Sequence, residues 1–242
     1  MRQYRIIGSI LFLWSISMFT NSLQAQQMIS NGKGLSQQEK SIISISALTA
    51  KGDLENLKSA LKEGLEAGLT VNEIKEILVH TYAYCGFPRS IRGLQTFMEV
   101  VSERKSNGIN DNLGVEASFK ELKESKYERG KKTLEELTKT PSPEKLVGYA
   151  AFAPVIDAFL KEHLFADIFE RDILTYSQRE WVTLSVISAI GDAEPMLKGH
   201  LAIALNVGAS PEQLKEFIVI IQTSIGSEKA KAAEKIVNEL VK

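Results

Sequence analysis

Residues 80–90, with the sequence HTYAYCGFPRS, bring together side chains that could do chemistry. They include a histidine, two tyrosines, an arginine and Cys85, which is the only cysteine of the chain. An arginine next to a thiol favours the thiolate, which is the nucleophilic form. A free cysteine is also a common and inert component of a hydrophobic core. The residues alone therefore leave two interpretations of Cys85 open, a reactive thiol and a buried one.

A helix beginning near residue 71 would place Cys85 on an apolar stripe and a set of polar residues on another stripe. The polar set is Glu73, Glu76, His80 and Tyr84. A carboxylate and an imidazole one turn apart, such as Glu76 and His80, can orient each other and act as an acid and a base. A solvated helix face explains the same row, and Glu73 also suits a capping role. Metal-binding spacings such as H-E-x-x-H are absent from the sequence, so no metal is expected.

Three more residues are candidates for a site. His200, in KGHLAIALNVG, lies beside the core face of its expected helix, where a structural histidine is the ordinary explanation. Arg89 and Arg92 follow the cysteine, and a guanidinium can hold a substrate carboxylate by two parallel hydrogen bonds. The remaining histidine, His163, fits packing within the connecting segment.

The chain contains two copies of one unit. A shift of 140 residues overlays 61–79 on 201–219 without a gap and Gly86 on Gly226. We expect a first unit at 35–104, a second unit at 172–242, and a linker with connecting helices at 105–171. The two copies differ in their chemistry: Glu73, His80, Tyr84 and Cys85 become Gln213, Ile220, Ser224 and Ile225, and His200 takes the place of Ala60. A single active site could therefore combine residues of both units.

Each unit is expected to be helical. Thr70 with Glu73, and Ser210 with Gln213, have the spacing of capping boxes at two helix starts. A glycine lies two residues before Thr70 and another two residues before Ser210, and each can end the previous helix in a left-handed conformation. Because no segment alternates apolar and polar residues between hairpin turns, the predicted fold class is all-α.

Residues 1–25 have the layout of a secretory signal peptide, with two arginines before a short apolar run and a plausible cut after Ala25. We therefore expect an exported, periplasmic protein with no stable membrane anchor after cleavage. The net charge is −1, and no basic tract suits nucleic acid. One cysteine cannot form a disulfide within the chain, so the core must stabilise the fold.

The stretches LTYSQREWVTLSVISAIGD, HLAIALNVGASPEQLKEFI and VNEIKEILVHTYAYCGFPRSI resemble the carboxymuconolactone decarboxylase family, which has the alkylhydroperoxidase D-like helical fold. The resemblance implies tandem helical units and a homo-oligomer, a trimer or a hexamer. It also implies one of two activities. The decarboxylases act on 4-carboxymuconolactone by acid/base chemistry without a cofactor.

The peroxidase-like members of that family use a C-x-x-C pair with an upstream glutamate and a downstream histidine. Cys85 would match the first cysteine and Glu73 the acid. Pro88 stands at the place of the second cysteine and Arg92 at that of the histidine. Without a resolving thiol, an oxidised Cys85 would need an external reductant.

We therefore expect a decarboxylase-like enzyme that acts on a small carboxylated or lactone substrate, with no cofactor and no metal. The candidate catalytic residues are Glu73, His80, Cys85 and His200. The candidate substrate-binding residues are Tyr84, Arg89 and Arg92. Two alternatives stay open at this point: a single-cysteine peroxidase-like or redox-sensing protein that uses Cys85, and an exported oligomeric binding protein without catalysis.

Overall fold

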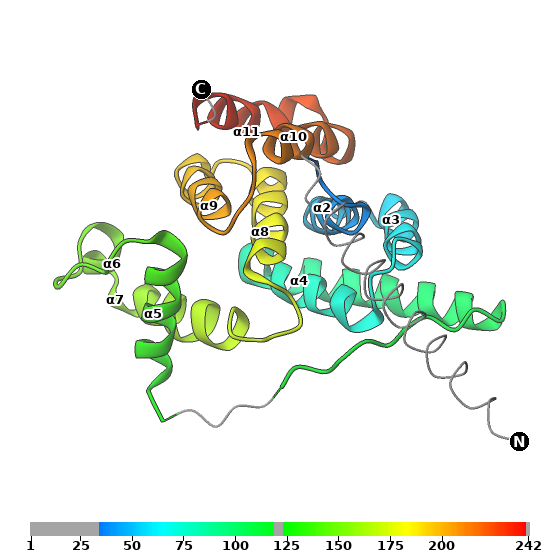
Figure 1. Cartoon of the computed structure of the whole chain (residues 1–242), viewed down its shortest axis with the longest axis horizontal. Helices are drawn as coiled ribbons and strands as arrows, with labels where there is room; N and C mark the ends of the chain where they lie inside the picture. The colour runs from blue at the N-terminus through cyan, green and yellow to red at the C-terminus, as the bar shows by residue number, and fades with distance from the viewer. Residues whose placement is uncertain (1–33, 119–122, 241–242) are drawn as a thin grey trace, which may run out of the picture.

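The computed structural model describes residues 34–118 and 123–240, and within these ranges it contains helices and no strands (Figure 1). The all-α prediction is confirmed. The expected signal peptide lies outside the described ranges. No helix in the described part of the chain is long and apolar enough to cross a membrane.

The helices fall into two similar sets and a connecting group. The first set is α2 (Gln37–Lys51), α3 (Leu54–Glu66) and α4 (Val71–Ser106). The second set is α8 (Tyr176–Ile190), α9 (Glu194–Asn206), α10 (Pro211–Ile225) and α11 (Ser227–Leu240). Between them lie α5 (Lys126–Thr138), α6 (Gly148–Phe152), α7 (Pro154–Phe159) and the π-helix η1 (Leu160–Ile168).

Both predicted capping boxes are present. The Thr70 hydroxyl accepts the backbone N–H of Glu73, and the Glu73 side chain bonds back to the Thr70 backbone. Ser210 and Gln213 repeat this arrangement at the start of α10. Gly68 and Gly208, which precede them, have φ angles of 93° and 106°, a conformation that costs glycine little.

The helix that carries Cys85 is interrupted directly after the cysteine. Gly86 and Pro88 are residues of the kind that break a helix, and α4 is interrupted at Gly86, where φ is 78° and ψ is 162°, before a second helical stretch runs on to Ser106. Pro88 lies in the first turn after this break, where a proline is well tolerated. Gly226 makes the same break between α10 and α11, with φ 92° and ψ 151°. The kink is thus a repeated feature of the unit.

The two units share one hydrophobic core. In Figure 1, α2 and α8 lie near the centre, α10 and α11 above them, and α4 crosses below. Trp181 of α8 is buried, packs against the Phe217 ring of α10 at a centroid distance of 5.9 Å, and donates its indole N–H to Glu39 of α2. Because helices of one unit pack on helices of the other, side chains far apart in sequence meet between them.

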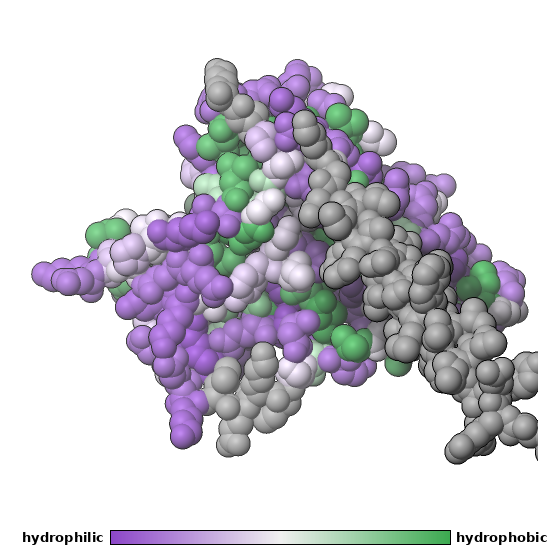
Figure 2. Space-filling view, viewed as in Figure 1, coloured by the Kyte–Doolittle hydropathy of each residue, from purple (hydrophilic) through white to green (hydrophobic). Residues whose placement is uncertain are grey.

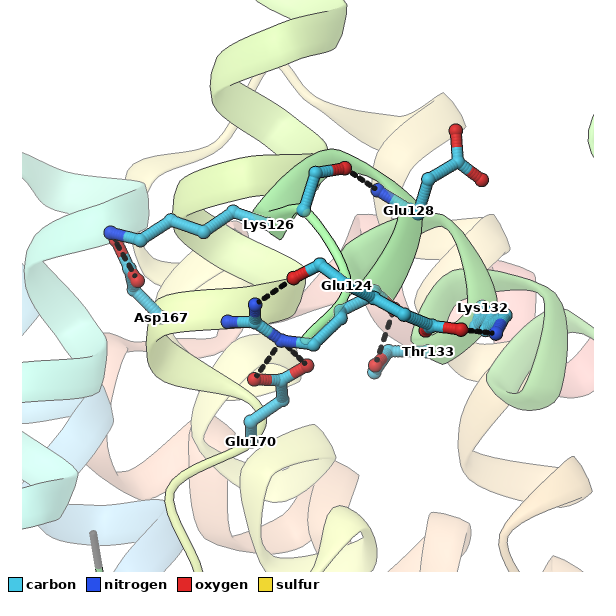
Figure 3. A network of polar contacts seen from close by, with 9 residues as sticks. Glu124, Lys126, Glu128, Lys132, Thr133, Asp167 and Glu170 are labelled. Carbon is cyan, nitrogen blue, oxygen red and sulfur yellow. Dashed lines mark hydrogen bonds and ion pairs between the residues drawn. The ribbon is translucent and has the colours of Figure 1, made fainter. Parts of the chain in front are cut away.

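The connecting segment differs from our expectation. The stretch AAFAPVIDAFLKEHLFADIFERD, residues 150–172, has the pattern of one amphipathic helix, whereas the structure has α6, a break at Ala153 before Pro154, then α7 and η1. The charged helix α5 packs along η1. Figure 3 shows the ion pairs that hold them: Lys126 with Asp167 at 2.8 Å, and Arg129 with Glu170 at 3.1 Å. This pair of helices brings Arg171 and Phe169 against α4.

Candidate active site

A buried polar cluster lies where α4 of the first unit meets α8 and α9 of the second. Its members come from three helices and from the turn after η1: Glu76, His80 and Tyr84 (α4), Arg179, Glu180 and Thr183 (α8), His200 (α9), and Phe169 and Arg171. The polar row predicted on the helix at 71–85 is therefore not a solvated face. Its central members are covered by the second unit.

Glu76 forms ion pairs with two arginines. Its side chain is 1% exposed. Its two oxygens lie 3.0 and 2.9 Å from Nε of Arg171, and Oε1 also lies 2.8 Å from Nη2 of Arg179. The sequence left open whether Glu76 and His80 orient each other as an acid and a base; in the structure Arg179 stands between them. Glu76 neutralises buried positive charge instead.

His80 is held by hydrogen bonds at both ring nitrogens. Nδ1 lies 3.1 Å from Nη1 of Arg179 and Nε2 lies 3.0 Å from Oγ1 of Thr183. Burial, and then the charge of Arg179, hold the pKa of His80 well below its usual value. The ring has no exposed surface and packs against Tyr84 and Phe169 at centroid distances of 5.5 and 5.2 Å.

His200 pairs with a buried carboxylate. Its Nδ1 lies 2.9 Å from Oε2 of Glu180, whose side chain is 1% exposed, whereas that of His200 is 14% exposed. The other oxygen of Glu180 is buried and has no hydrogen-bond partner among the residues described. A carboxylate on one ring nitrogen fixes the imidazole and leaves the second nitrogen for a ligand. We predicted His200 as a catalytic residue, but the sequence did not reveal Glu180.

Tyr84 completes the group around His200. Its ring meets the His200 ring edge-on at a centroid distance of 5.8 Å. Its hydroxyl is buried and has no partner with hydrogen-bond geometry within the described chain. Burial raises the pKa of Tyr84, and the nearby Glu180 carboxylate raises it further. The phenol therefore stays protonated and can donate a hydrogen bond.

The structure does not bring Cys85 and Glu73 together. The Cys85 thiol donates to the Thr81 carbonyl at 3.1 Å, and burial raises the pKa of the thiol to about 11, outweighing the opposite effect of Arg89. Glu73 instead caps its own helix, accepting from the backbone N–H and the hydroxyl of Thr70 at 2.7 and 2.8 Å. The geometry favours the inert interpretation of this thiol.

Arg89 and Arg92 lie apart from the buried cluster. Both are exposed. Arg92 donates to Gln95 at 2.7 Å, and Arg89 lies against Gly52 at the end of α2. The arginines at the cluster are Arg171 and Arg179, which sequence reasoning missed. The available signal was a charged Arg–Glu pair at 179–180, in a helix whose other residues are almost all buried.

The corresponding place in the repeat, where α2 meets α10, lacks the imidazoles and the phenol of the cluster. In the repeat, Lys40 corresponds to Arg179 and Glu216 corresponds to Glu76. Lys40 and Glu216 also form an ion pair, at 3.2 Å. Five cluster residues have small or apolar counterparts: Ser41 for Glu180, Ser44 for Thr183, Ala60 for His200, Ile220 for His80 and Ser224 for Tyr84. A cavity of about 350 Å³ lies there, lined by residues that include Lys40, Ser41, Ser44 and Ile220. Glu63 and Glu66 also line this cavity, but of the two corresponding places only the one at α4, α8 and α9 has the imidazoles and the phenol.

Among residues 34–118 and 123–240, no group of three or more His, Cys, Asp or Glu side chains is placed to hold a metal ion. The cluster's own donors explain this, because Glu76 is taken up by two arginines and Glu180 by His200. The chemistry available at the cluster is that of an imidazole, a carboxylate and a phenol.

Comparison with known proteins places the chain in a family. The profile described as "Carboxymuconolactone decarboxylase family" matches residues 20–97 and 154–239. The chain is also similar to the uncharacterized protein MJ1511 of Methanocaldococcus jannaschii, with 25% identity over 79 residues, which cover 33% of this chain and 74% of that protein. The chain therefore belongs to the carboxymuconolactone decarboxylase family, as a member with two tandem units.

Proposed function

We propose that this protein is an enzyme that moves a proton on a small carbonyl-containing substrate, with His200 as the acid/base group. The observation that carries the proposal is the 2.9 Å contact between His200 and the buried Glu180. Such a carboxylate fixes the orientation of the imidazole and stabilises its protonated form during reaction. The His200 side chain is 14% exposed, and Nε2, the ring nitrogen that does not face Glu180, is proposed to meet the ligand.

His200, Glu180 and Tyr84 have different roles in the proposed reaction. Nε2 of His200 takes the proton from the substrate, and Glu180 stabilises the imidazolium that forms. The electron pair released moves onto the substrate's carbonyl oxygen, and the Tyr84 hydroxyl donates a hydrogen bond to that oxyanion. In a decarboxylation, the bond to the carboxylate carbon breaks, CO₂ leaves with no electrons from that bond, and the electron pair stays on the carbonyl-stabilised fragment. A His200 that enters the reaction already protonated then gives its proton to the carbon and regains one from water.

Family membership supports the substrate class. The enzyme is proposed to act on a small carboxylated or lactone compound without a cofactor. The purified protein, incubated with 4-carboxymuconolactone and related lactones, is expected to release CO₂ or shift a double bond, and H200Q is expected not to. If the wild-type protein leaves all these lactones untouched, the substrate class is wrong.

A thiol-based activity has less support. An acid–histidine pair is present, Glu180 with His200, but the single cysteine lies in the other unit and its thiol is held on a backbone carbonyl. The raised pKa of Cys85 keeps little thiolate at neutral pH. We therefore do not assign a peroxidase or redox-sensing role to Cys85.

We also propose that the protein is exported to the periplasm and works as a homo-oligomer. The arginine-led apolar N-terminus supports export. The exposed apolar side chains of residues 147–159 support association: Val147, Tyr149, Phe152, Val155, Ile156 and Phe159 are each 46% to 93% exposed. Over α6 and α7, at the left of Figure 2, apolar residues interrupt a mostly hydrophilic surface. A patch of this kind is typical of an interface.

A further inference from the structure

The hydrogen bonds around His80 have a fixed direction. A guanidinium has N–H donors and no acceptor. Nδ1 of His80, 3.1 Å from Nη1 of Arg179, must therefore be the unprotonated nitrogen. A neutral ring then carries its proton on Nε2, and this N–H donates to the Thr183 hydroxyl oxygen at 3.0 Å. A protonated Nδ1 would put two N–H groups against each other in a site without water exposure.

Thr183 is consequently an acceptor toward His80, with its own proton left for another group. Two neighbouring hydroxyls of α8, Ser185 and Ser188, donate to carbonyls one turn earlier at 2.6 and 2.7 Å. Thr183 instead lies near Tyr84, because both contact the His80 ring: Thr183 through the 3.0 Å bond to Nε2, and Tyr84 by ring packing at a centroid distance of 5.5 Å. The Tyr84 oxygen, which is buried and has no hydrogen-bond partner among the described residues, is an acceptor toward which the Thr183 hydroxyl can turn.

We infer that His80 is a positioning residue, a fixed Nε2–H donor that turns the Thr183 hydroxyl toward Tyr84 and so directs the Tyr84 proton at the ligand beside His200. Arg179 fixes the direction of the hydrogen bonds that run from His80 through Thr183 to Tyr84. Glu76 and Arg171 hold Arg179 in place. The consequence is selectivity: at Tyr84 the site takes a ligand atom that accepts a hydrogen bond, such as a carbonyl oxygen. This role rests on the proposed function.

The surroundings of His80 support a ring that does not titrate. The charged and titratable groups that face it come from each element packed against it: Glu76 and Tyr84 on α4, Arg179 on α8, and His200 on α9. Glu76 could favour a charged imidazole, but both of its oxygens are bound by arginines. The remaining side is closed by the Phe169 ring.

Nitrogen NMR of the whole chain, labelled with ¹⁵N-histidine, tests the assignment without a substrate. His80 is expected to show a proton on Nε2 and none on Nδ1, unchanged from about pH 5.5 to 8. The exposed His163 is the reference for a ring open to solvent. A doubly protonated His80 ring at pH 6, or a proton on Nδ1, would overturn the inference.

Two matched variants test the role of Thr183. T183V keeps the shape but removes the acceptor, so the Nε2 proton of His80 should exchange faster with solvent, whereas T183S should behave as the wild type. Equal spectra for T183V and T183S would contradict the inference. If a lactone is turned over, T183V should lower the rate between about tenfold and a hundredfold through misplacement of Tyr84, with T183S restoring it. The NMR result can hold even if no lactone reacts, so the two proposals can fail separately.

Discussion

Arg179 and Glu76 form an ion pair of 2.8 Å in which the two side chains are 0% and 1% exposed. Its repeat counterpart, Lys40 with Glu216, has side chains that are each 38% exposed. The same contact between units thus exists once inside the core and once at the surface. This difference allows the energetic role of the buried pair to be measured within one molecule.

We expect E76Q to destabilise the protein far more than E216Q. Removing Glu76 leaves Arg179 charged and buried, which typically costs about 3–5 kcal/mol. Removing Glu216 breaks an exposed pair, for which about 0.2–1 kcal/mol is usual. The free energy of unfolding from urea titration measures both. Similar losses for the two variants would mean that Arg171 or water compensates for the missing Glu76 charge.

Loss of Glu180 should reduce catalysis while the fold is retained. In E180Q, His200 loses the carboxylate that stabilises its protonated form, and turnover of a lactone should fall by about 10²- to 10⁴-fold. The exposed pair of His163 and Asp167, with a 3.1 Å contact, offers a matched control. D167N should leave turnover unchanged. If E180Q and D167N have the same activity, the proposed acid/base pair is wrong.

Cys85 should react slowly with alkylating agents at neutral pH. With a pKa of about 11, the thiolate fraction at pH 7 is about one in ten thousand. The rate of reaction with iodoacetamide should therefore rise steadily from pH 7 to 10, whereas the same thiol in denatured protein should level off nearer its ordinary pKa. C85S should keep full activity. Rapid alkylation of the folded protein at pH 7 would restore the reactive interpretation.

The fold and three residues of the cluster, His80, Tyr84 and His200, could be named from the sequence, but the partners of these residues could not. The capping boxes at Thr70 and Ser210 and the glycines at 86 and 226 act within a few residues, so the sequence shows them directly. Burial of Glu76 depends on α8 lying across α4, and a helical wheel of one segment contains no information on its neighbour. Glu180 was missed for the same reason, because its partner His200 lies on another helix.

The kinks at Gly86 and Gly226 should tolerate no other residue well. Their backbone angles, with φ of 78° and 92° and ψ near 160° and 150°, fall in a region that is almost restricted to glycine. G86A and G226A should each lower the free energy of unfolding by about 1–3 kcal/mol. Gly199 lies inside α9 with open space around its Cβ position, so G199A is a suitable control. A neutral G86A would show that the kink can relax.

Finally, the exposed apolar side chains of α6 and α7 should hold the proposed homo-oligomer together. Phe152 is 93% exposed and Phe159 60% exposed, and burying such rings against a second copy removes apolar surface from water. The double variant F152D/F159D is therefore expected to have a lower mass in light scattering than the wild type. Val219 of α10, 62% exposed, provides the control, because V219D adds a charge to a different surface. If V219D dissociates the protein and F152D/F159D does not, the interface lies on α10 instead.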